Sequence, residues 1–219
     1  RRMGLFQGTE KYLKERVSES LGLLYANHYP YRQYISARNV RHSPIHERLI
    51  QSNACFGEVA GWERPNWFAP EGIAPVYEYS FGRQNWFEYS ATEHHAARKG
   101  VALFDQSSFS KYLVQGRDSC NVLQRMCTAD VDIELDQTRY THWLNPRGGI
   151  EADLTVTRLR EDRYFVVSGP AVTLRDLDWL SQNIGDSDRC TCTDVTSAWA
   201  VFGIMGPGSR TFLEQVTGK

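Results

Sequence analysis

Two carboxylates stand two residues apart in the segment 150–156, which alternates apolar and polar residues. Alternate side chains of an extended strand share a face, so Glu151 and Asp153 would lie about 7 Å apart on one side. The other side would carry the apolar residues Ile150, Ala152, Leu154 and Val156. A carboxylate pair of this kind can bind the amino groups of a polar ligand or tune a proton transfer. The same pattern is also typical of a half-exposed strand whose acidic face is solvated.

A pair of glycines, Gly148 and Gly149, directly precedes this strand in the sequence Asn145-Pro146-Arg147-Gly148-Gly149. Glycine allows a tight backbone turn and lets a ligand approach the backbone closely. On the residues alone, a hairpin turn is the stronger interpretation. The chain contains neither a G-x-G-x-x-G loop nor a G-K-[ST] loop, so a nucleotide-binding loop is not predicted.

Other reactive side chains do not form a recognisable constellation. His94 and His95 are adjacent in a predicted helix and point in different directions, so they cannot form the metal-binding pair that two histidines four residues apart would form. No acid–base partner can be assigned to the loop serines, which leaves a hydrolytic triad without support. Cys190 and Cys192 are interpreted as two positions on one face of a strand rather than as metal ligands.

The elements that must position these residues read as a mixture of helices and strands. Helices are predicted from Thr9, from Ser43-Pro44, from Thr92 to Lys99, from Arg117 or Asp118, over 173–183 and from Gly206. Strands are predicted over 56–59, 101–104, 111–115, 139–144, 150–159, 164–167 and 198–205. Strands interleaved with helices and hairpins favour an α+β fold rather than a barrel.

Composition excludes several classes of protein. The 219 residues include 25 basic and 26 acidic side chains, which argues against a large basic face for nucleic acid. No stretch approaches the roughly 18–20 apolar residues that span a bilayer. Five cysteines without a C-x-x-C pair suggest free thiols in a reducing compartment. Residues 1–70 carry 10 basic and 6 acidic residues and residues 71–219 carry 15 and 20, which places a boundary near residue 70.

Two long runs of sequence resemble the dimethylglycine and sarcosine dehydrogenase family. The run from YLKERVSESLGLL to GWERPNWFAP is similar to the central connecting region of those enzymes. The run NWFEYSATEHHAARKGVALFDQSSFSKYLVQG is similar to the start of their folate-binding domain, which resembles the glycine-cleavage T-protein, an aminomethyltransferase. The resemblance implies that residues 1–70 belong to the central region of an FAD-dependent oxidoreductase and residues 71–219 to the N-terminal part of a T-protein-like α+β domain. It also implies an internal fragment of a longer polypeptide.

In that family a flavin domain oxidises an N-methyl amine, and the released one-carbon unit passes to tetrahydrofolate. The resemblance therefore implies FAD and tetrahydrofolate as cofactors of the full-length enzyme, and a methylated amine as substrate. The electron acceptor would be either an electron-transfer flavoprotein or oxygen, and the resemblance leaves both open. The bacterial cytoplasm or the mitochondrial matrix is the implied location. A plain aminomethyltransferase, or a regulatory homologue like the pyruvate dehydrogenase phosphatase regulatory subunit, is the alternative.

The family's folate-site pattern falls on a short part of this chain. Its tyrosine, asparagine and paired glycines match Tyr140, Asn145, Gly148 and Gly149, and its functional acid matches Asp153. By resemblance, Asp153 would lie against the pterin-proximal part of tetrahydrofolate and assist transfer of the one-carbon unit. Ala152 stands where the family often has a second acid.

Overall fold

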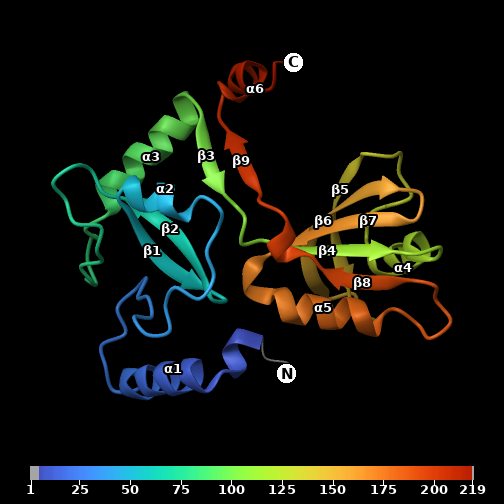
Figure 1. Cartoon of the computed structure of the whole chain (residues 1–219), viewed down its shortest axis with the longest axis horizontal. Helices are drawn as coiled ribbons and strands as arrows, with labels where there is room; N and C mark the ends of the chain where they lie inside the picture. The colour runs from blue at the N-terminus through green and yellow to red at the C-terminus, as the bar shows by residue number, and fades with distance from the viewer. Residues whose placement is uncertain (1–4, 219) are drawn as a thin grey trace. The chain divides into compact units, whose positions relative to one another are not determined.

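The computed structural model describes residues 5–218, and contacts divide these residues into two compact units (Figure 1). One unit is Phe109–Trp199, which contains the predicted site. The other joins Leu5–Ser108 to residues 200–218. Both contain helices and strands, so the predicted α+β class is confirmed. No helix among residues 5–218 is both long and apolar enough to cross a membrane.

A five-stranded antiparallel sheet forms the centre of the first unit, with strand order β5-β6-β7-β4-β8. Its strands are β4 (Ser110–Gln115), β5 (Thr138–Leu144), β6 (Ile150–Arg160), β7 (Arg163–Ser168) and β8 (Thr191–Asp194). The helices of this unit are α4 (Ser119–Met126), η2 (Pro170–Val172), α5 (Thr173–Gln182) and η3 (Thr196–Ala198).

One face of this sheet forms the core of the unit, because α4 and α5 both pack against it. Trp143, Tyr112 and Tyr164 are the largest side chains buried there, and Leu123 and Leu180 come from the two helices. Burial of apolar area at roughly 25 cal/mol per Å² is the main force that holds these helices to the sheet. The opposite face of β5 and β6 is left with polar side chains.

The alternation predicted for residues 150–156 is confirmed over most of its length. Ala152, Leu154 and Val156 are buried in the core, as expected. Ile150 is the exception, with 65% of its surface exposed. The pairing of β5 with β6 is irregular between Trp143 and Leu144, beside Ile150, so the strict alternation ends there.

In the second unit, β1 (Ala54–Val59) and β2 (Trp62–Phe68) form an antiparallel hairpin. A second pair joins β3 (Ala102–Asp105) to β9 (Phe202–Met205). The helices are η1 (Leu5–Gly8), α1 (Glu10–Leu23), α2 (His46–Gln51), α3 (Phe87–Lys99) and α6 (Ser209–Thr217). Trp67 is almost fully buried and stacks on Tyr89 of α3, with ring centroids 5.6 Å apart.

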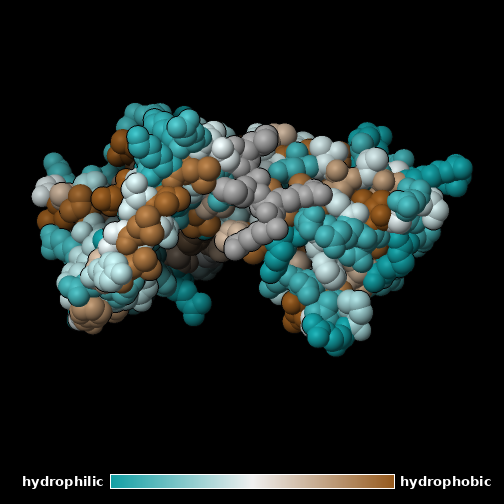
Figure 2. Space-filling model, turned by 90° about the horizontal axis from the view of Figure 1, so that it is seen from below, coloured by the Kyte–Doolittle hydropathy of each residue, from teal (hydrophilic) through white to brown (hydrophobic). Residues whose placement is uncertain are grey.

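Helix α1 begins as predicted, because Thr9 is its N-cap and accepts a hydrogen bond from the Tyr12 N–H. Its apolar stripe, however, lies at the surface. The exposed fractions rise from 37% at Leu13 to 66% at Leu24. Figure 2 looks from the side on which α1 lies and shows hydrophobic residues gathered over this part of the surface. The spacing of the apolar residues therefore correctly placed them on one face of the helix, but it did not predict that this face is exposed.

Several predicted boundaries were wrong. The helix predicted from Thr92 begins at Phe87, and the Thr92 hydroxyl bonds to the Glu88 carbonyl within the helix instead of capping it. Helix α2 begins at His46, whose N–H bonds to the Ser43 carbonyl rather than to the Ser43 hydroxyl. The strand predicted over 198–205 is shortened to β9, because its first residue belongs to η3.

The contacts divide the chain after Ser108 and again after Trp199. The boundary placed near residue 70 separates segments by composition and by family resemblance, which is a different criterion. The division into 1–70 and 71–219 stays a prediction.

Candidate functional site

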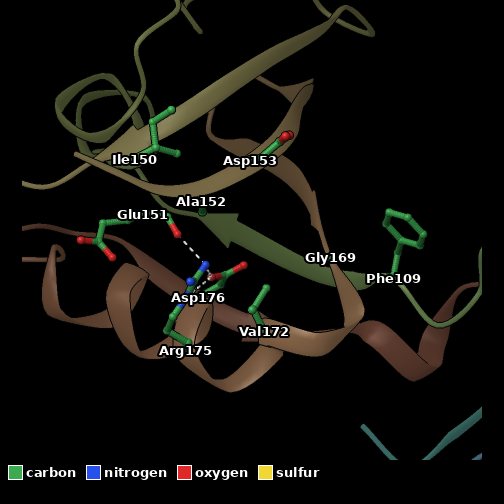
Figure 3. A pocket seen from close by; sticks show the side chains of 9 residues that line it. All are labelled: Phe109, Ile150, Glu151, Ala152, Asp153, Gly169, Val172, Arg175 and Asp176. Carbon is green, nitrogen blue, oxygen red and sulfur yellow. Dashed lines mark hydrogen bonds and ion pairs between the residues drawn. The ribbon is translucent and has the colours of Figure 1, made fainter. Parts of the chain in front are cut away.

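A cavity of about 470 Å³ opens beside the start of β6 (Figure 3). This volume lies within the range of small-molecule sites. The residues around it come from the residue before β4, from the β6 strand, from the segment after β7 and from the first turn of α5. Its lining residues are Phe109, Ile150, Glu151, Ala152, Asp153, Gly169, Val172, Arg175 and Asp176. Asp153, the principal residue predicted from the sequence, is among them.

Asp153 is exposed on the polar face of the sheet and is held by a neighbour on β5. The Tyr140 hydroxyl donates a hydrogen bond of 3.0 Å to Asp153 Oδ2. This bond raises the pKa of the Tyr140 phenol, because loss of its proton would place two negative charges side by side. Two predicted site residues, 13 positions apart in the sequence, are thus brought together by the β5–β6 hairpin. Asp153 Oδ1 has no protein hydrogen-bond donor among the described residues.

Glu151 has a hydrogen-bond partner of its own. Its Oε1 accepts a hydrogen bond of 2.8 Å from Asn145 Nδ2. Figure 3 shows its carboxylate turned away from that of Asp153. The two carboxylates thus have different hydrogen-bond partners, which favours a polar strand face over a cooperating carboxylate pair.

Asn145, Gly148 and Gly149 form the turn between β5 and β6, and they lie outside the nine residues that line the cavity. Asn145 Oδ1 accepts hydrogen bonds of 3.0 Å from the N–H groups of Arg147 and Gly149. Gly148 has a φ of +79°, which glycine adopts without strain. A Cβ on Gly149 would lie 2.8 Å from Asn145 Nδ2. The turn alone thus accounts for these three residue types.

A buried carboxylate forms another part of the cavity wall. Asp176 is 1% exposed and sits in the first turn of α5, where the helix dipole favours a negative charge. Burial raises the pKa of Asp176, although the Ser168 hydroxyl and the Arg175 guanidinium oppose that shift. Arg175 donates to Asp176 Oδ1 at 2.9 Å and to the Glu151 carbonyl, which ties α5 to the start of β6.

The arrangement favours ligands that carry N–H donors or a developing positive charge. Asp153 offers acceptor oxygens, whereas Asp176 is buried and Arg175 is already engaged by protein atoms. Phe109 and Val172 supply apolar surface beside them. Among residues 5–218, no group of three or more His, Cys, Asp or Glu side chains has the geometry of a metal site.

Sequence reasoning missed Phe109, Arg175 and Asp176. Their distance from Asp153 along the chain left no local motif. The packing of α5 against the sheet brings Arg175 and Asp176 to β6, and Phe109 directly precedes β4 of the same sheet. His142 was also missed, although a signal existed. It stands two residues after Tyr140 on a predicted strand, and strand alternation places both on one face.

Two family models cover the chain. Residues 45–219 match the GCVT N-terminal domain, and residues 1–43 match the FAD dependent oxidoreductase central domain. The change from one model to the other lies within the connector that precedes α2.

Curated relatives agree with these matches. The chain is 47% identical over 211 residues to the 4-methylaminobutanoate oxidase (formaldehyde-forming) of Paenarthrobacter nicotinovorans, covering 96% of the chain and 26% of the relative. It is 32% identical over 244 residues to the mitochondrial sarcosine dehydrogenase of Homo sapiens, covering 94% and 27%. The chain thus spans about a quarter of the length of these relatives. The resemblance stated from the sequence is confirmed.

A solved structure supports the fold. The glycine cleavage system aminomethyltransferase T from Bartonella henselae matches with a TM-score of 0.67 at 23% identity. The match covers 82% of this chain and 44% of that one.

Proposed function

Because the chain belongs to the family of GCVT N-terminal domains, and its residues 1–43 match an FAD dependent oxidoreductase central domain, we propose that it forms part of the folate site of an amine-oxidising enzyme. In this proposal the cavity beside Asp153 binds the pterin-proximal part of tetrahydrofolate. One observation carries the proposal. Asp153 lies at the cavity with Oδ2 held by Tyr140 and without a protein donor to Oδ1 among the described residues.

The chemistry of the cavity fits a reduced pterin. The ring system of a reduced pterin carries several N–H donors and two apolar faces, and tetrahydrofolate supplies the nitrogens that accept a one-carbon unit. The Asp153 carboxylate can accept hydrogen bonds from such donors, and Phe109 and Val172 offer apolar contact. Gly148 and Gly149 would contribute indirectly, by fixing the turn that begins β6.

Asp153 would serve the transfer electrostatically. An ionised carboxylate beside a nitrogen of the ligand stabilises positive charge as it develops there during transfer. Tyr140 would keep one carboxylate oxygen engaged and leave the other for the ligand, which restricts the orientations that the ligand can adopt.

The rest of the reaction belongs to the full-length protein in this proposal. Relatives named as a 4-methylaminobutanoate oxidase and a sarcosine dehydrogenase support an N-methyl amine as its substrate. This chain contains no G-x-G-x-x-G loop of the kind that binds the pyrophosphate of a dinucleotide. FAD would be bound by other parts of the full-length protein. Electron transfer to a flavoprotein partner, and a bacterial cytoplasmic or mitochondrial matrix location, are parts of the same proposal.

Substitution of Asp153 by Asn in the full-length protein tests the proposal. We expect the tetrahydrofolate-dependent transfer to fall about 10²–10³-fold, which is typical of removing one preorganised electrostatic group. Flavin reduction by the amine should not change. Asp136→Asn is the matched control, because Asp136 is exposed in the same unit and outside the cavity.

An equal loss of both activities in Asp153→Asn would contradict the assignment. Failure of the unsubstituted protein to bind tetrahydrofolate would favour the regulatory homologue instead.

A further inference from the structure

The polar face of β5 presents a histidine beside the tyrosine that holds Asp153. His142 Nε2 lies 3.3 Å from the Tyr140 hydroxyl oxygen, and the two rings meet edge to face with centroids 5.2 Å apart. His142 is also directly opposite Asp153 in the β5–β6 pairing. Three polar side chains therefore form one continuous chain of contacts on this face.

The number of protons fixes the direction of these hydrogen bonds. A carboxylate can only accept, so the single proton of the Tyr140 hydroxyl is used in the bond to Asp153. The Tyr140 oxygen can then only accept from His142, which requires a proton on Nε2. The order is His142 Nε2–H to Tyr140 Oη–H to Asp153 Oδ2.

From this geometry we infer that His142 is a positioning residue for the proposed one-carbon transfer, acting on Asp153 through the Tyr140 hydroxyl. The inference rests on the proposed function. Donation by His142 holds the Tyr140 oxygen in place and directs its proton toward Asp153. Tyr140 is 60% exposed, so little packing would otherwise fix the orientation of its ring.

The backbone around His142 is well held, which separates its structural role from that of its ring. Its N–H donates to Thr128 Oγ1 at 3.2 Å, and its carbonyl accepts from the Thr128 N–H at 3.0 Å. The acidic residue on that adjoining loop, Asp130, accepts hydrogen bonds from Gln124 and from the Asp132 N–H. Replacing the imidazole leaves all of these backbone bonds in place.

Two substitutions separate hydrogen bonding from bulk. His142→Leu removes the donor, whereas His142→Gln keeps an N–H near the position of Nε2. In the full-length protein, we expect His142→Leu to lower kcat for tetrahydrofolate-dependent transfer about threefold to tenfold, the usual effect of one hydrogen bond. KM for tetrahydrofolate should change less than twofold, because Asp153 remains present. His142→Gln should restore most of the rate.

A double-mutant cycle tests whether His142 acts through Tyr140. Tyr140→Phe removes the hydroxyl that links His142 to Asp153, so adding His142→Leu should cause no further loss. Thr138→Val is the matched control on the same strand and face. It removes a 2.8 Å cross-strand hydroxyl contact with Thr157 without touching the three residues, and kcat should stay unchanged.

The outcomes distinguish this inference from the proposed function. If the full-length protein transfers no one-carbon unit to tetrahydrofolate from sarcosine, dimethylglycine or 4-methylaminobutanoate, both fail. If Asp153→Asn abolishes transfer but His142→Leu behaves like Thr138→Val, the inference alone is overturned. It is equally overturned if His142→Leu costs the same factor with and without the Tyr140 hydroxyl.

Discussion

A buried ion pair ties the connector before α2 to the β1–β2 hairpin, and its removal should weaken this part of the chain. Glu63 on β2 is 4% exposed and accepts hydrogen bonds from Arg38 Nε at 2.9 Å and from the Asn39 N–H at 2.7 Å. Glu63→Gln removes the negative charge and turns an amide donor toward the guanidinium. Arg38, whose side chain is only 22% exposed, would lose its charged partner and keep only neutral ones such as the Tyr34 carbonyl.

The cost can be estimated from burial. Breaking a buried pair by removing one partner typically destabilises by about 3–5 kcal/mol. Because Arg38 can still reach some water, we expect the lower end, about 3 kcal/mol. In native-state hydrogen exchange this corresponds to roughly 150-fold faster exchange of the β1–β2 amides.

Glu88→Gln is the matched control. Glu88 pairs with Arg83 at 2.8 Å, but both side chains are at least 65% exposed. Exposed pairs contribute at most about 1 kcal/mol, so the same chemical change should alter exchange by less than about fivefold. Equal effects of Glu63→Gln and Glu88→Gln would refute the reasoning that burial makes the first pair important.

The effect should also depend on pH. Burial alone would raise the pKa of Glu63, but the hydrogen bonds from Arg38 and the Asn39 N–H outweigh it and lower the pKa below 4.5. A carboxyl whose pKa is lowered on folding stabilises the protein above its unfolded value, and this contribution is lost as pH falls through the folded pKa. The difference in β1–β2 exchange between the unsubstituted protein and Glu63→Gln should therefore be full at neutral pH and shrink below about pH 4.5.

Two further substitutions test the first unit. Trp143→Ala should destabilise it by about 3–5 kcal/mol, because Trp143 is fully buried. Trp199→Ala should cost less than about 1 kcal/mol, because Trp199 is 61% exposed. The midpoints of urea unfolding measure both effects. Asn145→Ala should speed amide exchange in the turn before β6, because Asn145 holds that turn. The dissociation constant for tetrahydrofolate should change less than about twofold, because Asn145 lies outside the cavity lining. A large loss of affinity with an unchanged turn would instead support direct folate contact by Asn145.

Local patterns predicted much of the polar strand but little of the cavity around it. Alternation along β6 correctly placed Ala152 and Leu154 inside and Asp153 outside. It failed at Ile150, because the strand pairing becomes irregular at that end and periodicity contains no information about a bulge. Arg175 and Asp176 could not be predicted, since the position of α5 depends on which face of the sheet it covers.

Helix α1 illustrates the same limit from the opposite side. The spacing of Leu13, Val17, Leu21 and Leu24 correctly indicated a helix with one apolar face. Burial depends on a neighbour as well as on periodicity, and these side chains are exposed among the described residues. The spacing of apolar residues therefore predicts that a helix forms, but it does not predict whether the apolar face of that helix is buried.

The geometry of the candidate site follows from the core beneath it. Side chains alternate along both strands of the hairpin, so a slip of one residue would move every side chain of a strand to the other face. Trp143 is fully buried between His142 and Leu144, and Leu154 is buried directly after Asp153. A slip that exposed these side chains would cost several kcal/mol of apolar burial. The same burial that stabilises the sheet therefore keeps Tyr140, His142 and Asp153 together on its polar face.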